Sequence, residues 1–142
     1  MRDILIKILL KFGAALWLVF SMNAFAVDCN NPPGGIDAES AQINYQCAEK
    51  DRHSADLKLN QAYKKLVSVL KDDPDSGLIP KTQIVYAQRA WVAFRDAECD
   101  LRTSVSGGAR QWLIVNHSQC LTELTEQRTK TLQDYLKQVQ DQ

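Results

Sequence analysis

The fold of this chain is decided by the stretch Ala87-Gln88-Arg89-Ala90-Trp91-Val92-Ala93-Phe94-Arg95-Asp96-Ala97-Glu98-Cys99. It is rich in strong helix formers, contains neither proline nor glycine, and carries two large aromatic residues, Trp91 and Phe94, at close helical spacing. Side chains three or four positions apart share a face of an α-helix, so the stretch predicts an amphipathic helix. It ends at Cys99, whose role depends on the compartment in which the chain folds.

The helix around this stretch is predicted to begin near Pro80, because proline is tolerated in a first turn, and to run to about Ser104. The segment Ser106-Gly107-Gly108 ends it, since glycine is too free to propagate a helix. One face is predicted to point into the core, and it comprises Ile84, Ala87, Trp91, Phe94 and Cys99. Most aromatic side chains are expected in the core as well, namely Tyr63, Tyr86, Trp91, Phe94 and Trp112.

A long helix is predicted before this one. Asp37 is its expected N-cap, and good helix formers continue almost unbroken to about Lys71. Apolar residues recur there at steps of three, four and seven positions, at Ala48, Ala55, Leu59, Ala62, Leu66 and Val69. At 1.5 Å per residue, a helix of ~34 residues would be ~50 Å long, which makes it the spine of the domain.

The segment Asp72-Asp73-Pro74-Asp75-Ser76-Gly77 separates the two helices. Its three acids and glycine invite comparison with a calcium-binding loop, which needs oxygen ligands at positions one, three and five, glycine at six and glutamate at twelve. Starting at Asp73 puts Gly77 at position five and Ile84 at position twelve, so the spacing does not fit. An acidic, solvated turn is predicted instead.

A third helical region follows the glycine pair, with Trp112, Val115, Leu121, Leu124, Leu132, Tyr135 and Leu136 at mixed three- and four-residue steps. An interruption is expected around Asn116-His117-Ser118. Because no segment alternates with period two, a sheet is not expected. Short connections make successive helices antiparallel, so the predicted fold is all-α, a small up-down-up helical hairpin bundle of about three helices.

The N-terminus has the features of an export signal. Cations at Arg2, Lys7 and Lys11 precede a short apolar run, and Ala24-Phe25-Ala26 supplies a signal-peptidase site. We expect residues 1–26 to be removed, leaving residues 27–142 as a single periplasmic or secreted domain. Cys29 follows Val27-Asp28 rather than a small residue, so a lipid anchor is not expected, and the protein should have no stable membrane anchor.

The four cysteines, Cys29, Cys47, Cys99 and Cys120, all lie in the exported part. An even number of cysteines in an oxidising compartment predicts two disulfides. Four cysteines allow three pairings; the bundle brings all four to one end and favours Cys29 with Cys47 and Cys99 with Cys120. The spacings do not match a zinc site, so neither a metal nor another cofactor is predicted.

The net charge and the surroundings of the two histidines argue against two classes of function, nucleic-acid binding and catalysis. Removing the three cations and one acid of residues 1–26 from 17 of each leaves 14 basic and 16 acidic residues, a net charge of about −2. This balance gives no support to nucleic-acid binding. His53 and His117 lack a neighbouring nucleophile or metal ligand, so the protein is not expected to be an enzyme.

Arg95 lies one helical turn beyond Trp91, where its stem can cover the indole ring and its guanidinium can meet Asp56 of the first helix. The other charged residues singled out beside it are Arg89, Asp96 and Arg128. A structural salt bridge between helices is the expected role of this group.

The chain resembles the LprI-type lysozyme inhibitor N-terminal domain family in the order of its motifs. The motifs are Cys29, Cys47-Ala48, Ala55-Asp56-x-x-Leu59-Asn60-x-x-Tyr63, Ala87-Gln88-Arg89-Ala90-Trp91, Phe94-Arg95-Asp96, Cys99, Gly107-Gly108, Cys120-Leu121, Leu124-Thr125 and Arg128. The resemblance implies a disulfide-bonded helical domain that binds and inhibits host lysozyme. Asp56, Asn60, Arg89, Trp91, Arg95, Asp96 and Arg128 are then family motif or structural residues.

Lysozyme has two carboxyl groups in its cleft, and an inhibitor can offer a cation to that pair. The loop of Gly107 and Gly108, with Arg110 beside it, is the expected partner-binding segment. The alternative is a non-catalytic periplasmic interaction module that binds another envelope protein through its helical faces.

Overall fold

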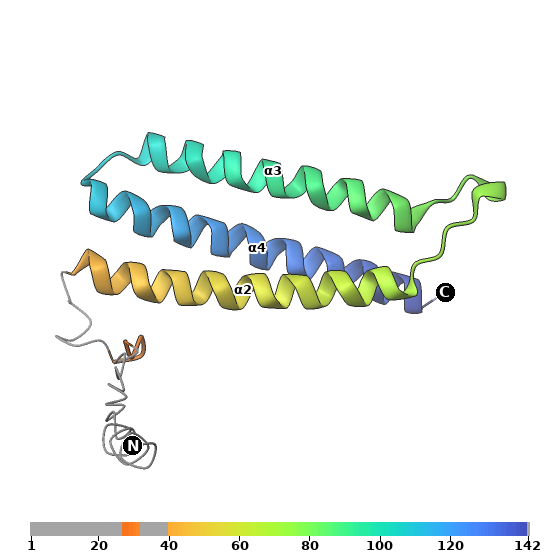
Figure 1. Cartoon of the computed structure of the whole chain (residues 1–142), viewed down its shortest axis with the longest axis horizontal. Coiled ribbons are helices and arrows are strands. Elements are labelled where there is room, and N and C mark those ends of the chain that lie inside the picture. The colour runs from red at the N-terminus through yellow and green to blue at the C-terminus, as the bar shows by residue number, and fades with distance from the viewer. Residues whose placement is uncertain (1–26, 32–39, 142) are drawn as a thin grey trace, which may run out of the picture.

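The computed structural model describes residues 27–31 and 40–141, and these form an antiparallel, all-helical domain (Figure 1). Its long helices are α2 (Ala41–Val69), α3 (Pro80–Ser106) and α4 (Arg110–Gln140), and a short 3-10 helix, η1 (Pro74–Ser76), lies between the first two. The predicted fold class and up-down-up order are confirmed. Residues 1–26, with the predicted signal peptide, lie outside the described part. Within that part, no helix combines the length and apolar character needed to cross a bilayer.

Helix α4 lies between the other two and packs against both, most extensively against α2 (Figure 1). One core cluster joins all three helices and contains Leu59, Ala62, Leu66, Ile84 and Leu132. A second cluster, toward the opposite end, contains Cys99, Cys120 and Leu124. Trp91 packs against both clusters and therefore connects them.

The three helices contribute unequally to the core. Helices α2 and α4 each bury a full stripe of residues, whereas α3 buries only Ile84 and Cys99. Ala87 is exposed, as are Phe94 (56%) and Tyr86 (67%). The prediction that these residues lie in the core is wrong. At 3.6 residues per turn, Phe94 lies about 140° around the helix from Cys99, so α3 cannot bury both against α4.

Two further aromatic residues, Tyr63 and Trp112, were predicted to lie in the core. Tyr63 is partly buried and packs against the first core cluster, as predicted. Trp112 remains 38% exposed in the first turn of α4, where α2 and α3 do not enclose it. Aromatic residues at helical spacing therefore fall on both buried and exposed faces of this bundle.

The first helix is shorter than predicted. Asp37 lies outside the described residues, and α2 begins at Ala41 with Ser40 as its N-cap, whose side-chain oxygen accepts a hydrogen bond from the Ile43 amide at 3.4 Å. The helix ends at Val69, because Leu70 turns to an extended conformation with ψ of 137°. The end predicted at Lys71 is therefore two residues too late.

The acidic segment between α2 and α3 does more than form a solvated turn. The Asp72 carboxylate accepts hydrogen bonds from the Lys81 and Thr82 amides at 2.8 and 3.3 Å and from the Thr82 hydroxyl at 2.6 Å. These bonds, that of the Thr82 hydroxyl above all, hold the pKa of Asp72 below its usual value. Asp72 thus satisfies amides in the first turn of α3, which has no cap from its own N-cap side chain.

The predicted interruption of the third helix is wrong, because α4 is continuous from Arg110 to Gln140. Two of the three polar residues that suggested a break, His117 and Ser118, contact neighbouring helices. Ser118 is 2% exposed and donates a hydrogen bond to Glu49 of α2, while His117 is 3.1 Å from Asp100 of α3. Their polarity therefore serves contacts between helices and leaves the backbone of α4 intact.

Candidate functional site

Both disulfides lie at the end of the bundle where α2 begins, α3 ends and α4 begins. The structure pairs Cys29 with Cys47 and Cys99 with Cys120, which confirms the favoured pairing. The first bond ties residues 27–31 to α2, and the second ties α3 to α4 across the glycine loop. Each closes a loop of about 20 residues, which in the chain-entropy model stabilises the fold by about 3 kcal/mol.

The glycine loop makes a turn that ordinary residues rarely adopt. Gly107 has φ of 64° and ψ of −169°, a region occupied almost solely by glycine, and Gly108 has φ of 103°. A Cβ at either position would meet no atom within 4 Å, so backbone conformation and not crowding calls for glycine here. The loop is therefore a tight connection, and the Cys99–Cys120 bond lies about two helical turns from it along α3 and about three along α4.

Next to this loop the three helices enclose a recess of about 380 Å³. Helix α2 contributes Tyr45 and Glu49, α3 contributes Thr103, and α4 contributes Arg110, Leu113, Ile114, His117 and Ser118. Arg110 is exposed at the first position of α4 and lines the rim of this recess. Of the predicted loop residues, Arg110 lines this recess together with polar groups of α2 that the sequence did not single out.

The negative charge inside the recess is already paired. Glu49 accepts hydrogen bonds from Arg52 at 2.7 Å and from the Ser118 hydroxyl at 2.7 Å. The bond from Arg52 is the main reason why the pKa of Glu49 lies below its usual value. Arg52 also contacts Asp56 at 3.2 Å, so this cation links two carboxylates along α2.

The beginning of α4 carries unneutralised positive character. Its N-cap, Ala109, provides no side-chain cap, and the first turn contains no acidic residue. Unpaired amides at a helix N-terminus carry partial positive charge, to which the Arg110 guanidinium adds a full charge. This arrangement can bind a carboxylate.

No group of histidine, cysteine or acidic side chains suited to a metal ion occurs among the described residues.

Farther along the bundle, the family motif residues form a layer around Trp91. The guanidinium carbons of Arg95 and Arg128 lie 5.3 and 5.9 Å from the Trp91 ring centroid. Arg95 also forms an ion pair with Asp56 of α2 at 3.3 Å and another with the adjacent Asp96 at 2.8 Å. The predicted bridge between helices is therefore present, and it is covered by the indole.

Two members of this layer were not identified from the sequence as partners. Thr125 of α4 is fully buried and its hydroxyl lies 3.2 Å from Arg95. Gln88 of α3 accepts a hydrogen bond at 3.0 Å from Nε of Arg128, whose Nη2 is buried without a partner. This burial lowers the pKa of Arg128. Both polar residues lie within motifs that the chain shares with the family, and this was the only feature of the sequence that pointed to them.

Two motif residues lie outside this layer. Asn60 and Arg89 are exposed on α2 and α3. The layer itself is built from interhelical contacts and is largely enclosed, so it positions the helices and offers little to a partner. The exposed motif residues and the loop are the groups that remain accessible.

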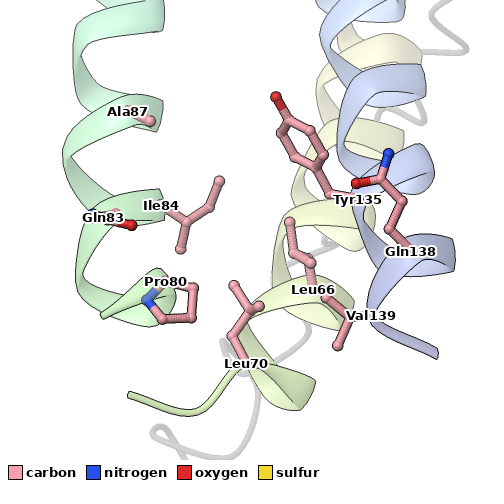
Figure 2. A pocket seen from close by; sticks show the side chains of 9 residues that line it. All are labelled: Leu66, Leu70, Pro80, Gln83, Ile84, Ala87, Tyr135, Gln138 and Val139. Atoms are coloured by element: carbon pink, nitrogen blue, oxygen red, sulfur yellow. The ribbon is translucent and has the colours of Figure 1, made fainter. Parts of the chain in front are cut away.

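A second hollow of about 380 Å³ lies at the opposite end, where α3 diverges from α2 and α4. Figure 2 shows Pro80, Gln83, Ile84 and Ala87 of α3 facing residues of α2 and α4 across this apolar groove. Those residues are Leu66 of α2, Leu70 directly after it, and Tyr135, Gln138 and Val139 of α4. The groove offers no charged side chain, so the recess beside the loop is better suited to a partner with carboxylates.

Comparisons with known proteins agree with this architecture. The model of a family described as lysozyme inhibitor LprI matches residues 35–132. An uncharacterized protein of Rhizobium meliloti (strain 1021) is 32% identical over 103 residues, which cover 67% of this chain and 73% of that protein. The crystal structure of a DUF1311 family protein from Pseudomonas putida KT2440 has a TM-score of 0.60 at 22% identity, over 70% of this chain and 97% of that one. The last similarity concerns the fold alone.

Proposed function

The chain belongs to the lysozyme inhibitor LprI family, and on this premise we propose that it is an exported, non-catalytic protein that binds lysozyme and inhibits it. The single observation that carries the proposal is the cationic start of α4, which follows a tight glycine loop at the disulfide-bonded end of the bundle. Residues Gly107, Gly108 and Arg110 form this binding segment.

Inhibition would follow from blocking the lysozyme cleft. Lysozyme acts with two carboxyl groups that flank the scissile bond. The Arg110 guanidinium would pair with one of them, while the loop and the rim of the recess would exclude the sugar chain. Because the loop is already braced, little conformational freedom is lost on binding. The net charge of about −2 on residues 27–142 would mildly favour encounter with a basic lysozyme.

Export is part of the same proposal. Both disulfides need an oxidising compartment to form and persist. We place signal cleavage after Ala26, so that the mature chain starts two residues before Cys29. N-terminal sequencing of the protein from a periplasmic extract should find Val27 first; full-length chain as the sole species would contradict this step.

The experiment is an activity assay of lysozyme on a peptidoglycan substrate in the presence of purified, oxidised protein. We expect inhibition by the wild type and inhibition about tenfold weaker for Arg110→Ala, the loss expected for a hydrogen bond between charged groups. Lys130→Ala is the matched control, since Lys130 is an exposed cation on the same helix. It should inhibit like the wild type.

A steric variant tests the loop without disturbing its glycines. Ala109 has an ordinary φ of −71°, so Ala109→Trp adds bulk beside Arg110 without forcing a side chain into the left-handed region. It should weaken inhibition while circular dichroism shows unchanged helix content. Full lysozyme activity in excess protein, for chicken-type, goose-type and invertebrate-type enzymes alike, would contradict the proposal. A module that binds another envelope protein, for which the apolar groove is suited, would then take its place.

A further inference from the structure

The outward face of α3 carries an apolar stripe that nothing in the described domain covers. The stripe consists of Tyr86, Ala90, Phe94, Ala97, Leu101 and Val105. Its four large side chains are exposed to 67%, 56%, 58% and 74% for Tyr86, Phe94, Leu101 and Val105, and both alanines are exposed. Contiguous exposed apolar residues on a globular protein usually mark an interaction surface.

The stripe is straight and accessible along most of the helix. At 3.6 residues per turn its six positions fall within an arc of about 100°, and from Tyr86 to Val105 it is about 29 Å long. Ile84 and Cys99 occupy the opposite side and face the core. Helix α3 lies at the edge of the domain, with α4 between it and α2, so a second helix can approach the stripe (Figure 1).

We propose that this stripe binds the same stripe of a second copy of the chain, with the two α3 helices antiparallel about a twofold axis. The sequence of large and small residues is complementary to its own reverse. With the axis midway between Phe94 and Ala97, Phe94 of each copy faces Ala97 of the other, Ala90 faces Leu101, and Tyr86 faces Val105. Large residues then fill the spaces above small ones, as in ridges-into-grooves packing.

Two opposite charges on one flank of the stripe, Arg89 and Asp100, fit the same arrangement. Arg89 and Asp100 lie within about 20° of each other around the helix. Arg89 is exposed, and the side chain of Asp100 is 76% exposed beside His117. In the antiparallel pair the same flanks of the two helices meet, and Arg89 of each copy comes within about two residues of Asp100 of the other. Two symmetric ion pairs then flank the apolar contact.

A parallel pair would lose both features. It would place Phe94 against Phe94, where two large side chains clash, and Ala90 against Ala90, where two small side chains leave a gap. It would also keep each Arg89 about 16 Å along the axis from the partner's Asp100, beyond the reach of an ion pair. The large-to-small order and the charges therefore both select the antiparallel arrangement.

Sedimentation equilibrium of the oxidised chain between micromolar and near-millimolar concentration tests the proposal. The wild type should show a monomer–dimer equilibrium, which Leu101→Glu should weaken at least about tenfold by placing two charges in the apolar contact. Leu57→Glu is the matched control, because Leu57 is an exposed leucine (50%) of α2 outside the stripe. It should associate like the wild type. A wild type that stays monomeric throughout, or equal loss of association in both variants, would overturn the proposal.

A charge exchange tests the orientation. Arg89→Asp and Asp100→Arg should each weaken the dimer, because each places like charges together, and the double variant should restore it. Thermal melts followed by circular dichroism check that the loss of the His117 contact has not unfolded α3. If both single variants weaken the dimer and the double variant does not recover, the antiparallel pairing is wrong.

Discussion

Helices α2 and α4 are held together by an extensive packed interface, whereas α3 is attached to them by a few specific contacts. The three helices have similar lengths of 29, 31 and 27 residues, yet α2 and α4 bury six and seven residues and α3 buries two. What holds α3 is the Cys99–Cys120 bond, the arginine layer around Trp91 and the Asp72 cap of its first turn. Equal helix-forming tendency therefore does not imply equal anchoring.

This difference bears on where function resides. The Cys99–Cys120 bond lies in the C-terminal third of α3, toward the loop and Arg110, whereas the layer around Trp91 lies near the middle of the helix and the Asp72 cap at its N-terminus. The N-terminal half of α3 diverges and leaves the apolar groove. A covalent link toward the loop and a face turned away from the core let one helix hold the loop in place and present an outer surface.

The largest expected effect is the loss of Trp91, which joins the two core clusters. Trp91→Ala should lower the free energy of unfolding by about 3 to 5 kcal/mol, the usual range for emptying a large aromatic site. Phe94→Ala, three residues away but 56% exposed, should change it by less than about 0.5 kcal/mol. Chemical denaturation of both variants measures the contrast, and similar midpoints would show that α3 is rotated differently on α4.

Removal of the Cys99–Cys120 bond comes next. The double variant Cys99→Ala/Cys120→Ala should lose about 3 kcal/mol by the chain-entropy argument. Hydrogen exchange should then quicken chiefly in α3, since α2 and α4 remain packed. Removing Cys29 and Cys47 in the same way should lower the free energy of unfolding by a similar amount but should not quicken exchange selectively in α3, because that bond ties residues 27–31 to α2. Equal effects on the helices would contradict the special role of the second bond.

The smallest expected effect is a dependence of stability on pH that arises from Glu49, which links α2 to α4 through Ser118. The pKa of Glu49 lies below its usual value of 4.5, chiefly through Arg52, so the native state resists its protonation. Its contribution is complete above that usual value and declines as the pH falls through the lowered pKa. Glu49→Gln should therefore flatten the loss of stability on acidification. Acid unfolding curves with the same slope for variant and wild type would show that Glu49 is uncoupled from folding.

The sequence predicted features that depend on local pattern. Helical spacing predicted the helices and their order, and the shared end of the bundle favoured the disulfide pairing. Arg95 could be placed over Trp91 because the two are four positions apart on one helix. Its reach to Asp56 followed once the helices were taken as antiparallel.

Features that depend on how the helices rotate against each other were not predicted. Phe94 and Trp91 both suit a core, and only the packing of α3 on α4 decides that Trp91 enters it. His117 and Ser118 suggested a break because their partners, Asp100 and Glu49, are distant in sequence. The Asp72 cap was missed because its acceptor and donors are nine and ten residues apart.

Hydrogen exchange of the oxidised protein, measured with and without saturating lysozyme, tests the central claim most directly. That claim is that the disulfide-braced end, with its loop and Arg110, is the surface that binds lysozyme. Lysozyme should slow exchange in the segment from the end of α3 through the first two turns of α4 and leave exchange around the apolar groove at the opposite end unchanged. No added protection, or protection confined to the groove, would contradict the account.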